Sequence, residues 1–176
     1  MSKVDNVLKQ MIYVTDNVDK VISEKKSSGK KVIGILPIYA PEELVHAAGM
    51  LSVGCWGGSA DISMATKYLP PFACSIMQEV MEYAERGVYK DLDAFVVSTP
   101  CDTLKAISQN LIYACPDQKV IIFTHPQNNK MEAAITFVKS EFSKVKAQLE
   151  AVAGMAISDE AINESIEIYN DNRRAL

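Results

Sequence analysis

The chain has 176 residues, of which 48% are hydrophobic and 23% charged, so it is long enough to bury one sizeable core. Its net charge of −4 and pI of about 5.2 argue against binding to nucleic acid or anionic membranes, since both need a basic face. No apolar run approaches the roughly 18 residues that span a bilayer, and the N-terminus carries charges where a secretion signal has an apolar core. We therefore expect a cytoplasmic protein with no nucleic-acid or membrane partner.

The first 29 residues predict a single N-terminal helix. Apolar residues recur at helical spacing from Val4 to Ile22, with charged residues on the opposite face, and Gly29 ends the pattern. This arrangement is typical of a helix whose apolar stripe lies on a core.

Short apolar runs then alternate with helical patterns. Strands are predicted over residues 31–36, 51–55, 93–98 and 119–123. Helices are predicted over residues 41–48, 59–68, 72–86, from residue 100, over 130–151 and after Ser158. The alternation indicates an α/β fold: a Rossmann-like parallel sheet of about four strands with helices on both faces, plus N- and C-terminal helices. The expected units are an N-terminal helix (1–29), the Rossmann-like domain (30–153) and a C-terminal helix (154–176).

The last third of the chain gives two packing predictions. The long helix should end at Gly154, and Ile157 and Ile162 are placed as a hydrophobic staple around the start of the last helix. The expected buried face of the long helix is Ala134, Val138, Phe142, Val145 and Leu149.

The segment 94–104 reads as a strand that runs directly into a helix. Thr99 is the expected N-cap and Pro100 the first helical residue, while Asp102 is placed to accept a hydrogen bond from the cap. Cys101 then lies in the first helical turn, where a thiol loses its proton more easily and can bind a metal as thiolate. The alternative is that Cys101 is a small apolar residue filling the strand–helix junction.

Cys74 follows a double proline and also opens a predicted helix, 27 residues before Cys101. If both helices start at one edge of the sheet, both sulfurs can reach one iron–sulfur cluster, whose negative charge the helix dipoles would offset. Cys55 ends a strand and Cys115 precedes a proline, so both are interpreted as core or edge residues. The wide spacing of the four cysteines gives no C-x-x-C pair and argues against a closed zinc site.

Other polar residues leave alternatives open. His46 lies four residues after Glu42 and three after Glu43, which fits either an acid–base pair or a solvated surface pair. His125 is either a loop residue bonded to backbone or a residue that lines a site. Ligands of parallel α/β sheets bind beyond the carboxyl ends of the strands. The residues expected to line that edge are Tyr39, Cys55, Thr99 and His125.

Three motifs together resemble one known family. They are PIYAPEELVHAAGM (37–50), YLPPFACSIMQ (68–78) and DAFVVSTPCDTL (93–104), in that order. The combination is similar to the subunits of 2-hydroxyacyl-CoA dehydratases, a family that also contains the cluster subunits of benzoyl-CoA reductase. The similarity covers most of residues 30–126.

The resemblance implies a subunit of two Rossmann-like domains with a [4Fe-4S] cluster between them. Cys74 and Cys101 match two of the cluster's cysteine ligands, and the third protein ligand is expected outside this chain. Family subunits are about twice as long, so the C-terminal helix (154–176) is expected to lead towards an absent second domain. The isolated chain is accordingly expected to be inactive.

The resemblance also implies a reaction. A separate ATP-hydrolysing iron–sulfur activator supplies one electron, the open iron of the cluster binds the thioester carbonyl, and a ketyl radical expels the 2-hydroxyl group. The net reaction is dehydration of an (R)-2-hydroxyacyl-CoA to an enoyl-CoA by an oxygen-sensitive heterodimer of two related subunits. Residues 39–46 are expected to shape the acyl-CoA pocket, with Glu43 as a catalytic polar group near the substrate.

Two alternatives remain at this point. The chain is also compatible with a benzoyl-CoA-reductase-like subunit, in which the same cluster passes electrons into an aromatic ring. A half-length protein is also compatible with a non-catalytic binding or assembly module that keeps the fold and has no active cluster.

Overall fold

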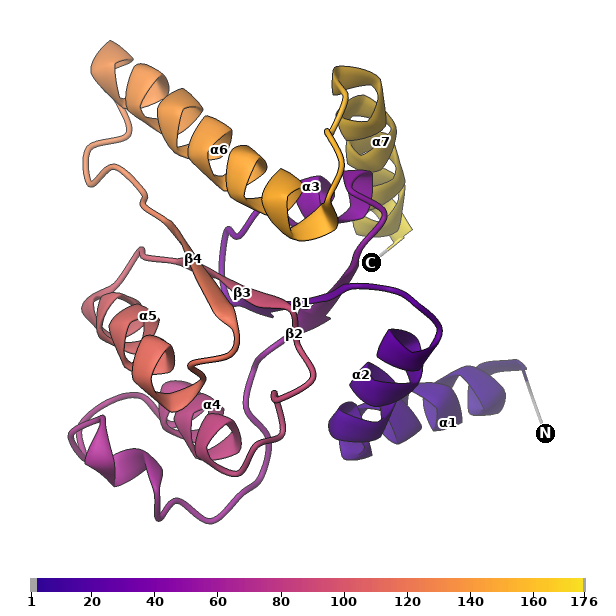
Figure 1. The fold of residues 1–176 in the computed structure, drawn as a ribbon, viewed down its shortest axis with the longest axis vertical. Coiled ribbons are helices and arrows are strands. Elements are labelled where there is room, and N and C mark those ends of the chain that lie inside the picture. Colours follow the sequence, from indigo (N-terminus) through magenta and orange to yellow (C-terminus); the bar gives the residue numbers. More distant parts are fainter. Residues whose placement is uncertain (1–2, 176) are drawn as a thin grey trace.

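A computed structural model describes residues 3–175 and confirms the α/β class (Figure 1). Its sheet is entirely parallel, in the order β2-β1-β3-β4. The strands are β1 (Val32–Leu36), β2 (Leu51–Gly54), β3 (Ala94–Ser98) and β4 (Lys119–Phe123). The helices are α1 (Lys3–Asp16), α2 (Val18–Ser27), α3 (Glu42–Ala47), α4 (Ser75–Glu85), α5 (Asp102–Ala114), α6 (Glu132–Ala153) and α7 (Asp159–Ala175), with a 3₁₀ turn η1 (Ala65–Lys67).

Helices cover both faces of the sheet, as predicted. Alternate strand residues point to opposite sides: Phe95 and Val97 pack with α2, α4 and α5, whereas Ile33 and Val96 pack with α3 and α6. Figure 1 shows α4 and α5 below the sheet and α3, α6 and α7 above it. Right-handed crossovers require this division, because the chain moves across the sheet in one direction through α3 and in the other through α4 and α5.

The strand order reverses between β1 and β3. The connection after β1 leads to α3 on one face, and the connection after β3 leads to α5 on the other. Such a switch point leaves a crevice beyond the carboxyl ends of the two strands, which is where open α/β sheets bind ligands. The hydroxyl of Ser98 donates to the carbonyl of Ile38, which links the two connections at their origin.

The N-terminal prediction is wrong in two respects: two helices replace the expected single one, and the apolar stripe of the first helix does not lie on the core. They meet at Asn17, which has a non-helical backbone (φ −135°, ψ 43°) and whose side-chain amide donates to the carbonyl of Tyr13 at 3.0 Å. Asparagine competes in this way with helical hydrogen bonds. The helix α2 buries Ile22 in the core, but α1 has no buried residue.

The C-terminal third largely follows its sequence pattern. The helix α6 ends where Gly154 adopts a left-handed conformation (φ 76°), and Ile157 is buried at the start of α7. The buried face of α6 contains Glu141, which was not predicted, whereas Phe142 is 40% exposed. The Glu141 carboxylate accepts from the backbone N–H of Thr124, which explains why a charged residue occupies this position.

The prediction of a helix over residues 59–68 is also wrong, since only the turn η1 forms there. Among the described residues, no helix has both the length and the apolar character needed to cross a bilayer.

Replacing Gly34 in β1 with alanine should destabilise the fold by about 1–3 kcal/mol, because the core has no room for a methyl group there. An added Cβ would lie 2.7 Å from Leu92 Cδ1 and 2.9 Å from Phe95 Cδ1. Urea unfolding would measure the loss. In the double variant with Leu92→Ala the combined loss should be smaller than the sum of the two single losses; a strictly additive result would contradict the steric cause.

Candidate functional site

Cys101 is the N-cap of α5, with an extended backbone (φ −134°, ψ 165°) and an exposed side chain. The helix therefore begins two residues later than predicted. Thr99 is buried instead of capping the helix, and its N–H donates to the carbonyl of Phe123 at 3.0 Å. This bond extends the pairing of β3 with β4, so tertiary contact overrides the local capping preference.

Asp102 is the first residue of α5, and it does not accept the predicted hydrogen bond from the N-cap residue. Its carboxylate is exposed and pairs with Lys105, three residues later, at 3.0 Å. The Cys101 side chain makes no capping hydrogen bond either. The first turn of α5 thus presents backbone N–H groups that no side chain caps.

Cys74 is the N-cap of α4, again with an extended backbone (φ −62°, ψ 145°) and an exposed side chain. The segment before it is tied down by Gln78, whose side-chain amide donates to the carbonyls of Pro71 at 3.1 Å and Ala73 at 2.7 Å. These bonds hold residues 71–73 outside the helix and explain why α4 starts later than the predicted residue 72.

Topology places the two cysteines at the same edge. Helices α4 and α5 pack against each other, and each runs back from the carboxyl end of one strand towards the amino end of the next (Figure 1). Cys74 and Cys101 therefore cap two neighbouring helices that begin at the carboxyl edge of the sheet. The positive ends of both helix dipoles face that edge, which favours a negatively charged group there.

The other two cysteines lie in the core, as interpreted from their sequence positions. Burial raises the pKa of Cys55 to about 12 and that of Cys115 to about 11. Both thiols therefore lose a proton less readily than an ordinary cysteine does.

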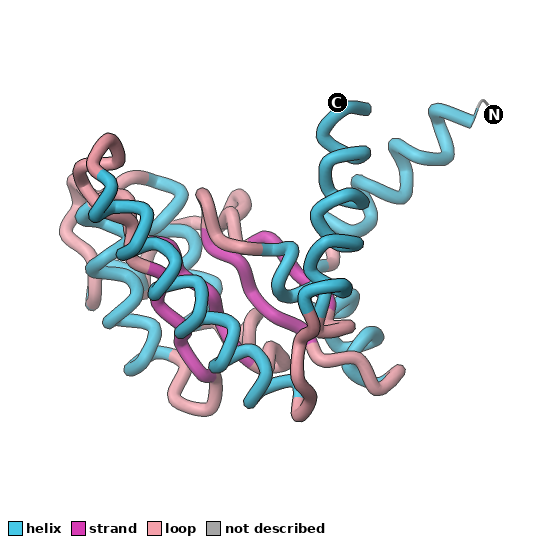
Figure 2. The backbone as a smooth tube through the Cα atoms, turned by 90° about the horizontal axis from the view of Figure 1, so that it is seen from above, coloured by secondary structure: helices cyan, strands magenta, loops and turns pink. Residues whose placement is uncertain are grey.

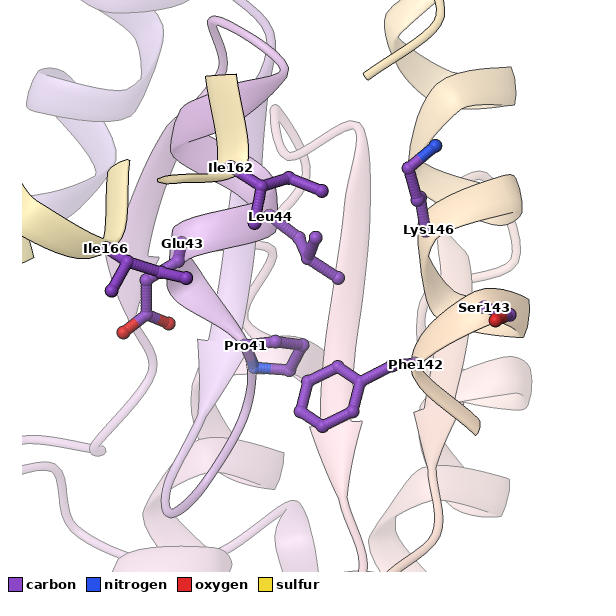
Figure 3. Close-up of a pocket in the computed structure, with 8 residues that line it drawn as sticks. All are labelled: Pro41, Glu43, Leu44, Phe142, Ser143, Lys146, Ile162 and Ile166. Carbon is purple, nitrogen blue, oxygen red and sulfur yellow. The ribbon is translucent and has the colours of Figure 1, made fainter. Parts of the chain in front are cut away.

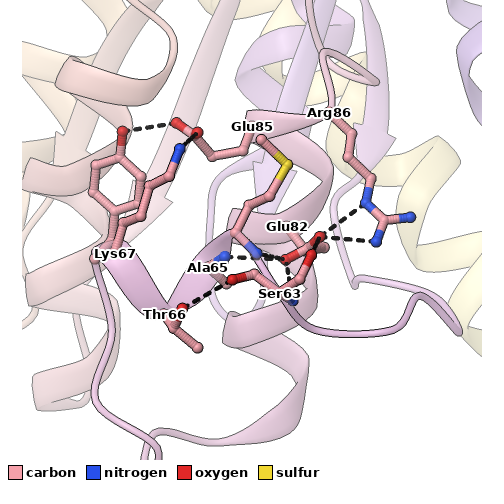
Figure 4. Close-up of polar contacts among 9 residues, drawn as sticks. Ser63, Ala65, Thr66, Lys67, Glu82, Glu85 and Arg86 are labelled. Carbon is pink, nitrogen blue, oxygen red and sulfur yellow. Dashed lines mark hydrogen bonds and ion pairs between the residues drawn. The ribbon is translucent and has the colours of Figure 1, made fainter.

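A buried carboxylate organises the segment that leads to Cys74 (Figure 4). Glu82 of α4 is fully buried and accepts from the backbone N–H groups of Ser63 at 2.9 Å, Met64 at 2.7 Å and Ala65 at 3.0 Å. Arg86 completes its environment with an ion pair at 2.8 Å. Burial acts to raise the pKa of Glu82, but the hydrogen bonds from Ala65, Ser63 and Arg86 outweigh it and lower the pKa to about 2.

Glu85, the last residue of α4, holds the later part of this segment, at residues 67 and 68. Its carboxylate bonds Lys67 Nζ at 2.8 Å and the hydroxyl of Tyr68 at 2.7 Å. Residues 63–68 are thus clamped to α4: the backbone N–H groups of 63–65 donate to Glu82, and the side chains of Lys67 and Tyr68 donate to Glu85. Sequence reasoning missed Glu82; its one local signal was Arg86, four residues later on the same helix.

Two of the residues expected at the carboxyl edge do gather there. Tyr39 adopts a left-handed backbone (φ 65°), and its ring lies 5.6 Å from that of His125, centre to centre. Both line a cavity of about 510 Å³ together with Pro100, the neighbour of Cys101. Burial lowers the pKa of His125, so its imidazole is neutral at physiological pH.

Glu43 and His46 lie elsewhere. His46 Nδ1 is 2.8 Å from the hydroxyl of Ser165 on α7, and Glu43 pairs with Arg173 of the same helix, so neither predicted Glu–His pair forms. Glu43 borders an apolar cavity of about 470 Å³ between α3, α6 and α7 (Figure 3). The sheet separates this cavity from the helices that carry the two exposed cysteines.

Large aromatic side chains are exposed on the segments that surround the carboxyl edge. Tyr39 is 68% exposed, Trp56 55% and Phe72, two residues before Cys74, 90%. Within residues 3–175, no three or more His, Cys, Asp and Glu side chains come together in a way that could hold a metal ion. The carboxyl edge therefore carries exposed aromatic side chains beside the two exposed thiols.

Comparison with known proteins assigns the family. Residues 37–176 match the 2-hydroxyglutaryl-CoA dehydratase, D-component, family, and the chain belongs to it. The whole chain is 50% identical to part of the lactoyl-CoA dehydratase β subunit of Anaerotignum propionicum and 38% identical to part of the (R)-phenyllactyl-CoA dehydratase β subunit of Clostridium sporogenes, covering 47% of each. It thus spans about half the length of the curated relatives it matches, and the resemblance inferred from the three motifs is confirmed.

Replacing Glu82 with glutamine should lower stability in a pH-dependent way. Because its pKa falls from an ordinary 4.5 in the unfolded chain to about 2, the carboxylate stabilises the fold above pH 4.5, and this contribution is lost as pH falls towards 2. Urea midpoints should therefore differ most between the parent and Glu82→Gln at pH 6–7 and converge below pH 4.5. Glu164→Gln, which alters an exposed carboxylate on α7, is the control; a constant Glu82→Gln difference from pH 7 to 3 would contradict the assignment.

Proposed function

We propose that this chain is one half of the β subunit of a 2-hydroxyacyl-CoA dehydratase and that Cys74 and Cys101 ligate its [4Fe-4S] cluster. One observation carries the proposal: two exposed cysteines occupy the N-cap positions of neighbouring helices at the carboxyl edge of the sheet. Cysteine thiolates are the usual ligands of such clusters. Two sulfurs from separate helices, both beside dipole ends that stabilise negative charge, fit the group.

The donor set is incomplete within the described residues, so the remaining ligands come from outside them. When bound, the cluster supplies single-electron transfer at a CoA thioester. The chain's own residues hold and shelter that site. The clamps at Glu82 and Glu85 fix the segment before Cys74, and the exposed aromatic rim around the edge gives a covering domain an apolar surface from which to exclude water.

The relatives support the substrate class. Two are named for lactoyl-CoA and (R)-phenyllactyl-CoA, and the (R)-2-hydroxyglutaryl-CoA dehydratase β subunit of Acidaminococcus fermentans is 36% identical over 96% of the chain. We take dehydration of an (R)-2-hydroxyacyl-CoA to an enoyl-CoA as the reaction of the whole enzyme. Its expected partners are an α subunit and an ATP-dependent iron–sulfur activator, in an anaerobic cytoplasm.

Substituting either exposed cysteine should abolish cluster retention. The test uses the chain lengthened by the half of the lactoyl-CoA dehydratase β subunit that it does not cover, purified without oxygen. The lengthened chain should hold about four irons. Cys74→Ala and Cys101→Ala should each lose most of this iron and its visible absorbance, with circular dichroism unchanged because both side chains are exposed.

Cys115→Ala is the matched control, since it removes a buried thiol and should retain the iron. Loss of iron in the control with retention in Cys101→Ala would reverse the ligand assignment. A lengthened chain that folds but binds no iron would overturn the cluster proposal and favour the non-catalytic binding or assembly module.

Glu43 provides a second test, of its proposed role near the substrate. Glu43→Gln breaks the ion pair with Arg173, but exposed pairs contribute at most about 1 kcal/mol, so folding should persist. If Glu43 acts on the substrate, Glu43→Gln in the complete enzyme should lower kcat/KM at least tenfold, while Arg173→Gln, which breaks the same pair, should not. Equal losses in both variants would mean that Glu43 acts only by holding α7 in place.

A further inference from the structure

The helix α1 presents an apolar face that nothing in the described chain covers. Its 14 residues include none that is buried, and Met11 in the middle of the face is 60% exposed. A helix of this length is marginal in water unless tertiary packing supports it. The face consists of Val4, Val7, Leu8, Met11 and Val14, which share one side at helical spacing.

The apolar surface continues from α1 onto the body of the domain. A groove of about 330 Å³ lies between the end of α1, the helix α2 and the strand β2, and its lining includes Val14, Val18, Val21 and Val53. The strand β2 is at the edge of the sheet, so its outer backbone groups pair with no other strand of the sheet. Helix face and groove together make one surface of the kind that marks an interface.

The last turn of α1 and the end of α7 both lie near the carboxyl edge of the sheet. His46 contacts Ser165, while Glu43, nearer the start of α3, contacts Arg173, so α7 runs antiparallel to α3 and ends near the carboxyl edge. The last turn of α1 borders Gly54, the carboxyl end of β2. Figure 2 shows α1 and the end of α7 projecting on the same side of the molecule.

We propose that the apolar face of α1 packs against the half of the subunit that this chain does not cover. The proposal rests on the proposed function in one respect: it takes that half to lie over the carboxyl edge. The curated relatives are about twice as long, and the end of α7 projects on the same side of the molecule as α1. The relatives' match also includes α1, because it covers the whole chain, whereas the family match begins at residue 37. In this proposal, α1 packs on the second half of the subunit and holds it against the first.

Hydrogen–deuterium exchange tests this contact. In the 176-residue chain, amides of α1 should exchange much faster than those of the buried strand β3. In the chain lengthened by the uncovered half of the lactoyl-CoA dehydratase β subunit, exchange in α1 should slow at least tenfold. Protection of β3 in both chains serves as the internal check that the domain is folded.

A pair of variants locates the contact on the apolar face. Met11→Glu places a charge within the face and should abolish the added protection of α1 in the lengthened chain. Asn6→Glu introduces the same charge roughly 140° around the helix and should leave the protection intact.

Three results would overturn the proposal. The first is equally fast exchange of α1 in both chains. The second is protection that appears only when the α subunit is added, which would make α1 an intersubunit contact. The third is concentration-dependent protection in the 176-residue chain, which would indicate self-association. None of these measurements uses iron. A lengthened chain that binds no iron but protects α1 would therefore contradict the cluster assignment and still support the contact of α1.

Discussion

A single buried carboxylate, that of Glu82, sets the position of Cys74. The connection from β2 to α4 is twenty residues long and contains one short turn of regular structure, so its backbone donors need acceptors. Glu82 takes three consecutive N–H groups at residues 63–65, and Glu85 takes the side chains at 67 and 68. Both glutamates belong to the helix that Cys74 caps. The irregular segment and the cysteine are therefore held by the same rigid element.

Topology then brings the second sulfur to the same place. Cys101 follows β3 directly, and its helix packs beside α4 because both connections cross the same face of the sheet. Twenty-seven residues of sequence separate the two cysteines, yet both cap helices that begin at one edge. A parallel sheet gives this convergence because each crossover helix starts at the same carboxyl edge, which is why α/β folds so often build sites from residues distant in sequence.

The sequence was sufficient for the fold class and for which cysteines lie at helix starts and which lie in the core, and it was insufficient where the partners of a residue are distant. Apolar runs located the strands to within a residue or two; for β1 and β3 this is because strands that are buried along their whole length leave little freedom in composition. Thr99 was misassigned because it pairs with Phe123 of the next strand, and His46 because its partner Ser165 lies 119 residues away. Glu82 and Glu141 were missed for a related reason: a buried carboxylate looks like a surface residue until the N–H groups that it binds are placed.

The helix α1 also shows that a sequence pattern does not identify a distant packing partner. Its periodicity is that of a helix packed on a core, and the periodicity is real, but the structure leaves that face open. An amphipathic pattern specifies that a helix needs an apolar partner and does not say whether the partner belongs to the same domain. Three features lie at or near the carboxyl edge of the sheet. They are the last turn of α1, the exposed aromatic residues at 39, 56 and 72, and the end of α7. Part of the exposed apolar surface therefore surrounds the carboxyl edge, and this is the part that the proposed second half would cover.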